Sequence, residues 1–288
     1  MTIVAAWEHW TKRTADAEDA ASPKVGQLVF ASDSRFSGGG SIWDANAKIF
    51  NIGRDDCLVA FTGETDRALP LIFQAISAAS SYEGSRLRTL DVPAFSDHFT
   101  KVLNSVLSEL RDETVGARGD GDPGCKFLLG GWSWALSRFV IYRIFFDKRL
   151  GEFTKGKVKK KPGALADISQ VGAMDFIGDK EAESEFRSIL PQVVKQYSDK
   201  PVVDCDRKEG LSLPLEAVYR QTQSSSHTVG GPVQVSIVSQ RIHAEHLAVD
   251  VDGQLTINGR RRLKGERMNV RRVRREGFAD WRIYNSVP

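Results

Sequence analysis

A short apolar run that ends in a carboxylate and a guanidinium constrains the fold of this chain more than any other feature. The run Leu28–Ala31 is followed, after one serine, by Asp33 and then by Arg35. Continuous apolar runs of this length are typical of strands that are buried on both faces. Burying a carboxylate at the mouth of such a strand costs free energy unless the group is paired or used. The stretch therefore predicts a covered strand, Gln27–Ser32, with a polar site at its end.

A second β-type run, Ile3–Trp7, begins directly after Thr2. Thr2 becomes the amino-terminal residue if Met1 is removed, and its small side chain permits that removal. A threonine hydroxyl beside its own free α-amine is a nucleophile with a built-in base, because such an amine titrates near about pH 8. The first strand is therefore expected to present a candidate nucleophile at its start.

Two further segments complete an ordered set, namely Lys48 and the pair Thr62-Gly63 ahead of Asp66. Lys48 follows Asp33 by 15 residues and precedes Asp66 by 18. With this order and spacing the chain resembles the proteasome-type family of N-terminal nucleophile hydrolases. It looks most like the compact bacterial members, the ancestral β-subunit homologues and the HslV-type peptidases. Each segment alone is common, since strand-end aspartates usually cap turns and strand-edge lysines are usually solvated.

The resemblance implies a threonine peptidase with roles for individual residues. Thr2 Oγ would attack a peptide carbonyl, and its own α-amine would relay the proton. Lys48 would lower the effective pKa of the hydroxyl, and Asp33 would keep Lys48 charged and oriented. Backbone N–H groups around Thr62 and Gly63 would stabilise the oxyanion. Arg35 is expected at the substrate site, where it would buttress the site or pair with a carboxylate.

Two helper positions depart from the family pattern. Active members carry a Ser-Gly pair before the third helix, where this chain has Ile177–Lys180, so Asp179 is the candidate relay. Ser226 stands where the family has an aspartate ahead of a Ser-Gly-Gly segment, of which Gly230-Gly231 is present here. Two interpretations stay open, an enzyme with an altered relay and a catalytically weak or inactive scaffold of the proteasome fold.

The predicted elements run in the order strands, two helices, strands, two helices, strands. This order indicates an α+β fold, a four-layer αββα sandwich in which helix pairs cover two stacked sheets. The first predicted helix begins at Thr65. The other three cover Phe95–Leu110, Lys180–Tyr197 and Leu213–Gln223. The predicted strands are Ile3–Trp7, Gln27–Ser32, Lys48–Ile52, Cys57–Phe61, Phe127–Trp132, Phe139–Phe146, Met174–Ile177, Pro232–Gln240 and Ile242–Val249.

The connections are expected to be less regular. Glu8–Lys24 is predicted to be a long hairpin connection or a short helix, Phe36–Asp44 a flexible loop, and Lys155–Lys161 a basic surface loop. The family-like domain is expected to span residues 1–250, and residues 251–288 to form a basic C-terminal extension on or beside it. Asp252-Gly253 predicts a hairpin turn within that extension.

Composition narrows the classes of function. A net charge of +3 gives no general case for binding nucleic acid, and three widely spaced cysteines fit a reducing cytoplasm. No signal peptide and no apolar run long enough to span a membrane is expected. No cofactor is expected either. His243 and His246 would face opposite sides of a strand, and a calcium loop from Asp250 would need a glutamate where Arg261 stands.

The tract from Arg260 to Arg275 is the most strongly charged part of the chain, with arginines at 260, 261, 262, 267, 271, 272, 274 and 275. One interpretation is a solvated strand face or a contact with an acidic surface of a neighbouring subunit. The other is a site for nucleic acid or an acidic partner, which Lys155–Lys161 would extend. The resemblance implies peptide or unfolded protein as substrate, a homo-oligomer that is a ring or a helix, and an ATPase as one candidate partner.

Overall fold

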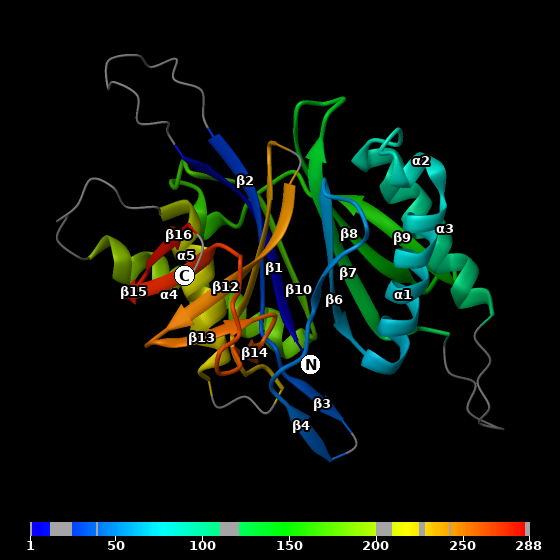
Figure 1. Ribbon diagram of the computed structural model, residues 1–288. Coiled ribbons are helices and arrows are strands. Elements are labelled where there is room, and N and C mark those ends of the chain that lie inside the picture. Colours follow the sequence, from blue (N-terminus) through cyan, green and yellow to red (C-terminus); the bar gives the residue numbers. More distant parts are fainter. Residues whose placement is uncertain are drawn as a thin grey trace.

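Helices and mostly antiparallel sheets make up this chain, which places it in the mixed α and β class. The computed structural model describes residues 2–11, 25–38, 40–109, 121–199, 209–224, 228–241 and 243–285. Figure 1 shows two sheets face to face, with α4 (Lys180–Ser198) and α5 (Glu209–Thr222) beside one and α1 (Thr65–Ser81) and α3 (Val92–Ser108) beside the other. Within the described residues, no helix is long and apolar enough to cross a membrane.

The larger sheet joins segments from both ends of the chain. Its strands are hydrogen-bonded in the order β10-β1-β2-β11-β12-β13-β14, and β15 pairs in parallel with β12 and antiparallel with β16. Their bounds are β1 (Ile3–Thr11), β2 (Val25–Ser32), β10 (Val171–Gly178), β11 (Gln234–Ser239), β12 (His243–Val251), β13 (Gln254–Ile257), β14 (Arg260–Arg261), β15 (Arg272–Gly277) and β16 (Asp280–Tyr284).

The smaller sheet is an antiparallel meander in the order β5-β6-β7-β8-β9. Its bounds are β5 (Ile49–Asn51), β6 (Cys57–Gly63), β7 (Cys125–Ser133), β8 (Arg138–Asp147) and β9 (Glu152–Lys157). A separate ribbon pairs β3 (Phe36–Gly38) with β4 (Ser41–Trp43). The sheets contain every strand that the sequence predicts, with ends that differ by up to four residues.

The cores explain why the strands read as continuous apolar runs. Val29 and Ala31 of β2 pack in the cluster beneath α4 and α5, whereas Leu28 and Phe30 pack in a second cluster between the two sheets. All four side chains are fully buried, as the sequence predicts. A third cluster, which includes Phe99, lies between the smaller sheet and the helices α1 and α3.

The four predicted long helices are confirmed, with shifted ends. In α1 the buried side chains of Ala68, Leu71, Ile72 and Ala75 recur at three- and four-residue spacing, which makes one apolar face. Helix α5 starts at Glu209, four residues before the prediction, and contains Pro214 in its interior. The sequence does not predict the short helix α2 (Glu83–Arg86), because one turn is too short to show a period.

Three loop predictions need correction. Phe36–Asp44 is not a simple flexible loop, because the ribbon of β3 and β4 occupies most of it and Gly40 turns at a φ of 80°. Lys155–Lys161 is not wholly a loop, because its first three residues belong to β9. The segment Glu8–Lys24 begins as strand, since β1 continues through Thr11, and residues 12–24 lie outside the described part.

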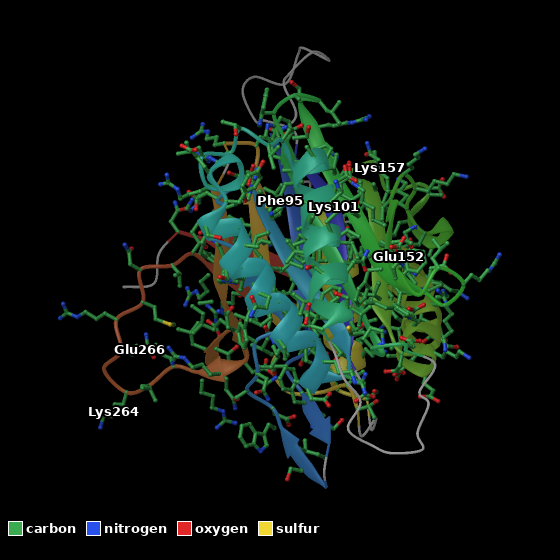
Figure 2. The ribbon with its side chains drawn as sticks, turned by 90° about the vertical axis from the view of Figure 1, so that its right-hand side faces the viewer. Phe95, Lys101, Glu152, Lys157, Lys264 and Glu266 are labelled. Carbon is green, nitrogen blue, oxygen red and sulfur yellow. The ribbon has the colours of Figure 1, made fainter. Side chains whose placement is uncertain are left out.

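The C-terminal arm, residues 252–285, continues the larger sheet. The predicted hairpin at Asp252-Gly253 is confirmed, because β12 and β13 pair on either side of it. Trp281 of β16 is fully buried against α5, and its indole N–H donates to Glu216 at 3.0 Å. In Figure 2 the loop after β14, marked by Lys264 and Glu266, extends away from the sheets.

Candidate functional site

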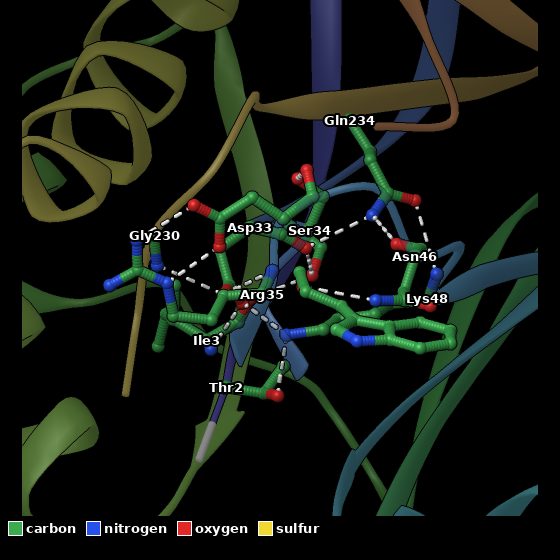
Figure 3. Close-up of polar contacts among 12 residues, drawn as sticks. Thr2, Ile3, Asp33, Ser34, Arg35, Asn46, Lys48, Gly230 and Gln234 are labelled. Carbon is green, nitrogen blue, oxygen red and sulfur yellow. Dashed lines mark hydrogen bonds and ion pairs between the residues drawn. The ribbon is translucent and has the colours of Figure 1, made fainter. Parts of the chain in front are cut away.

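Thr2, Asp33 and Lys48 meet at one end of the two sheets. The Lys48 ammonium donates to Thr2 Oγ1 at 2.7 Å and to Asp33 Oδ1 at 2.9 Å (Figure 3). Thr2 precedes β1, Asp33 follows β2, and Lys48 precedes β5 of the other sheet. The side chains of Asp33 and Lys48 are fully buried, and Thr2 is 4% exposed. The sequence named these three residues, and the fold brings them into direct contact.

Asp33 is surrounded by hydrogen-bond donors. Besides the Lys48 ammonium, the backbone N–H groups of Ile3, Arg35 and Gly230 donate to its two oxygens at 3.1, 3.1 and 3.2 Å. Burial raises the pKa of this carboxyl from its ordinary value, whereas Lys48 and the N–H donors lower it. Because four donors of the described residues face the two oxygens, the ionised form fits this site at neutral pH.

Lys48 is held in surroundings that oppose its charge. Burial lowers the pKa of its ammonium from the ordinary value, and the Asp33 carboxylate counters that effect. The ring of Phe36 lies 5.4 Å from the ammonium and adds a cation–π contact. A cationic group against a hydroxyl oxygen favours the deprotonated hydroxyl, and a lysine with a lowered pKa exchanges protons readily. The chemistry available is therefore activation of the Thr2 hydroxyl.

A cavity of about 1020 Å³ opens in front of Thr2. Thr62, Gly63, Arg35 and Asp179 line it together with Thr2, so the other predicted site residues of the described part border the same space. Arg143, also on its wall, pairs with Asp175 at 2.6 Å. A space of this volume holds a ligand of several residues.

Gly63, at the end of β6, requires glycine. Its φ is 105°, and a Cβ there would lie 1.9 Å from the carbonyl oxygen of Gly124. The neighbouring Glu64 N–H donates to that same carbonyl at 3.1 Å, which fixes the turn into α1. The backbone of Thr62 and Gly63 is thus held at the wall of the cavity, where the sequence placed oxyanion donors.

Arg35 pairs with a carboxylate, as one of its two expected roles requires. Its guanidinium makes a bidentate pair with Asp44, at 2.7 and 2.8 Å. The pair joins the residue before β3 to the residue after β4 and so closes the base of the ribbon. The Arg35 guanidinium holds the pKa of the Asp44 carboxyl below its ordinary value. The Arg35 backbone N–H also donates to Asp33, so this residue buttresses the site through its main chain.

Asp179 lies next to Thr2 in the sheet, because Ile3 pairs with Gly178 in the β1–β10 register. Its Oδ1 accepts from the Ala182 N–H at 3.0 Å and caps α4. Its Oδ2 is buried and has no hydrogen-bond partner among the described residues. A carboxylate oxygen without a partner among the described residues can accept a further hydrogen bond. Ser226, the other relay candidate, lies outside the described residues.

Sequence reasoning misses two contributions to the site. The Gly230 N–H donates to Asp33, whereas the sequence shows only the family-like Gly-Gly pattern at this position. Gln234, at the start of β11, bonds the backbone on both sides of the site and has no local sequence signal. Gln234 stands at the start of a buried strand, where its amide must find hydrogen-bond partners. The sequence does not show which partners these are.

The arginine-rich tract is largely neutralised within the chain. Arg271 pairs with Glu245, Arg275 makes a bidentate pair with Glu216, and Arg272 and Arg274 share Asp250. Arg260 pairs with Glu266, which also accepts from the Leu263 N–H at 2.9 Å. Arg262, Lys264 and Arg267 of the loop after β14 are exposed, as is Arg261 within β14. The exposed cations of the tract therefore lie mainly on β14 and in this loop, and Arg274 of β15 is exposed as well.

His246, Asp250 and Lys155 have hydrogen-bond or ion-pair partners within the fold. His246 is hydrogen-bonded through Nδ1 to Ser236 at 2.7 Å, while His243 is exposed. Asp250 pairs with arginines. Lys155 is bonded to Ser96 at 2.6 Å, so it does not extend the basic surface freely. In the part of the chain that the structure describes, no group of three or more His, Cys, Asp or Glu side chains could hold a metal ion.

The sequence matches no protein-family model, and no curated protein matches it.

Proposed function

We propose that this protein is a threonine peptidase of the proteasome-type N-terminal nucleophile class, active once removal of Met1 exposes Thr2. The observation that carries the proposal is the position of the Lys48 ammonium, 2.7 Å from Thr2 Oγ1 and 2.9 Å from Asp33. A buried lysine between a hydroxyl and a carboxylate is the arrangement that such a nucleophile requires. The sequence named all three residues from their order alone.

In the proposed reaction, Thr2 Oγ attacks a peptide carbonyl and its α-amine accepts the hydroxyl proton. An acyl ester forms on Thr2, the amine leaving group departs with a proton, and water then hydrolyses the ester. Lys48 stabilises the developing alkoxide, and Asp33 holds Lys48 in place. Backbone N–H groups at Thr62 and Gly63 supply the oxyanion site, with roughly 3–4 kcal/mol per donor in other hydrolases. The unpartnered Asp179 oxygen would accept from the Thr2 amine.

The arrangement of helices and sheets supports the same class. Helices, sheet, sheet and helices follow one another across the molecule, as expected for an αββα sandwich. The class further implies a self-assembled ring or helical oligomer that acts on peptides or unfolded protein in the cytoplasm. Ile42 and Trp43 on the β3–β4 ribbon, 51% and 69% exposed, offer apolar surface for such an assembly to cover.

A second candidate is a catalytically weak or inactive scaffold of the same fold whose basic tail recruits a partner. The end of β14 and the loop after it favour this candidate, because Arg261, Arg262, Lys264 and Arg267 are exposed around Leu263, which is itself 68% exposed. Such a scaffold does not need a free Thr2 amine.

Intact-mass measurement and covalent labelling separate the two candidates. The peptidase should lack Met1, hydrolyse unfolded peptides and gain one adduct on Thr2 from a peptide epoxyketone, which reacts with a hydroxyl and an adjacent amine. Thr2→Ala should lose hydrolysis and labelling, whereas the matched Thr154→Ala, on β9, should keep both. Retention of Met1 with no labelling would support the scaffold, and hydrolysis by purified Thr2→Ala would contradict the assignment of the nucleophile.

A further inference from the structure

The side chain of Gln234 connects the segment that carries Asp33 with the segment that carries Lys48. Gln234 opens β11, is 1% exposed and pairs with Ser32 in the β2–β11 register, directly beside Asp33. Its side chain reaches across to the segment that carries Lys48 (Figure 3). We infer that Gln234 is a positioning residue that holds Lys48 in place against Asp33 and Thr2. This inference rests on the proposed peptidase function for its catalytic consequence.

Only one orientation of the Gln234 side-chain amide satisfies the hydrogen bonds around it. Its Nε2 donates to the carbonyl oxygens of Asp33 at 3.0 Å and of Asn46 at 2.6 Å, and its Oε1 accepts from the Lys48 N–H at 3.1 Å. A flipped amide would set Oε1 against two carbonyl oxygens and Nε2 against an N–H. Both donors are therefore used, and the three partners fix the side chain.

The bridge matters because the two sheets meet here without a shared strand ladder. Asp33 follows β2 of the larger sheet, whereas Lys48 leads into β5 of the smaller one. A backbone hydrogen bond also links the two segments, from the Asn46 N–H to the Ser34 carbonyl at 3.1 Å. Gln234, of the larger sheet, adds two bonds to the segment that carries Lys48, at the Asn46 carbonyl and the Lys48 N–H, and a third to Asp33. It thereby sets the offset between the sheets on which the 2.7 Å contact of Lys48 with Thr2 depends.

The side-chain hydrogen bonds of Gln234 described here all go to main-chain atoms, so its effect passes through the positions of Lys48 and Asp33. Misplacing a catalytic group by about 1 Å can cost on the order of 10²-fold in rate. Loss of the bridge should therefore lower kcat. It should leave substrate affinity unchanged, because Gln234 does not line the cavity in front of Thr2.

Gln234→Met tests the inference, because methionine keeps the length of the side chain and removes its donors and acceptor. Gln221→Met is the matched control. Gln221 is also fully buried and also donates to a backbone carbonyl, that of Ala182 at 2.8 Å, but it joins α5 to α4 away from Lys48. Both full-length variants are compared with the natural chain by peptide hydrolysis and by the NMR signal of the Lys48 ammonium in protein carrying ¹⁵N-lysine.

Gln234→Met should lower kcat by about 10- to 100-fold with KM within about twofold, and should broaden or lose the Lys48 ammonium signal. Gln221→Met should leave kcat and that signal unchanged. An unchanged kcat in an active protein, or an intact ammonium signal in Gln234→Met, would overturn the positioning role. If the natural chain hydrolyses nothing yet the signal is lost in Gln234→Met, the peptidase proposal fails and the positioning of Lys48 stands.

Discussion

Two buried ion pairs in this molecule have nearly the same exposure and different surroundings. Arg54 and Asp56, at the β5–β6 turn, form a bidentate pair in which both side chains are at most 1% exposed. The remaining Arg54 donors reach the carbonyls of Ser85 and Leu90, and the guanidinium lies 4.5 Å from the Phe95 ring. Protein groups thus surround this pair, and it ties the turn to the connections around α2.

The Lys48–Asp33 pair is equally buried, yet one of its contacts is the hydroxyl of a residue that borders an open cavity. Burial lowers the pKa of the Lys48 ammonium. For Arg54 burial also opposes the charge, but the hydrogen bond with Asp56 helps to outweigh it and the pKa is raised. A lysine can give up its proton in the physiological range and an arginine cannot. Of the two buried cations, only Lys48 can therefore exchange a proton with the group that it contacts.

The largest expected difference between the two pairs is in catalysis. Under the proposed function, Lys48→Met should lower kcat/KM by at least about 10³-fold, because it removes the cation beside the proposed nucleophile, Thr2. Arg54→Met should change kcat/KM by less than about threefold per folded molecule, since the two sites share no partner. Peptide hydrolysis, corrected for the folded fraction by circular dichroism, measures both. Equal losses of kcat/KM in the two variants would contradict a catalytic role that belongs to the Lys48–Asp33 pair alone.

The order should reverse for stability. Arg54→Met should lower the free energy of unfolding by about 3–5 kcal/mol, because Asp56 stays buried without this partner and two carbonyls lose their donor. Lys48→Met should cost less, roughly 1–3 kcal/mol, since Asp33 keeps three backbone N–H donors and the burial of an ammonium is avoided. Urea denaturation at pH 7 tests this, and a larger loss for Lys48→Met would contradict it.

The smallest expected effect concerns two buried cysteines, one at the cavity wall and one beside the Arg54–Asp56 pair. Burial raises the pKa of the Cys125 thiol, at the cavity wall, to about 12, and raises that of Cys57, beside Asp56, well above its usual range. A raised pKa keeps a thiol protonated, so alkylation at pH 7–9 should be slow for both. It should rise about tenfold per pH unit at Cys125 and stay undetected at Cys57. Peptide mass mapping after brief iodoacetamide treatment measures this, with urea-unfolded protein as the fully labelled control. Rapid labelling of Cys57 in folded protein would show that its surroundings open.

The sequence predicts what depends on local order. The run Leu28–Ala31, the helical spacing from Ala68 to Ala75 and the turn at Asp252-Gly253 all carry their structure in neighbouring residues. Thr2, Asp33 and Lys48 can be found because their order resembles a known family, and their contact distances follow from the fold.

The features that the sequence does not predict depend on distant partners. The residues Phe36–Asp44 contain enough glycine to suggest a loop, and pairing across Gly40 makes them a ribbon. In the sequence, Arg54 and Asp56 resemble ordinary turn residues. The carbonyls that accept from Arg54 belong to Ser85 and Leu90, which follow α1, 31 and 36 residues later in the chain. The arginines of the C-terminal arm resemble a binding surface, although Glu216, Glu245 and Asp250 neutralise many of them.

The site is assembled from parts far apart in the chain, and this has a consequence during synthesis. Gln234 is 186 residues from Lys48 and 201 from Asp33, and Gly230 is 197 from Asp33. A nascent chain lacks these contacts until most of it has left the ribosome. Under the proposed function, the growing polypeptide stays inactive until residues 230–234, at the start of β11, have emerged.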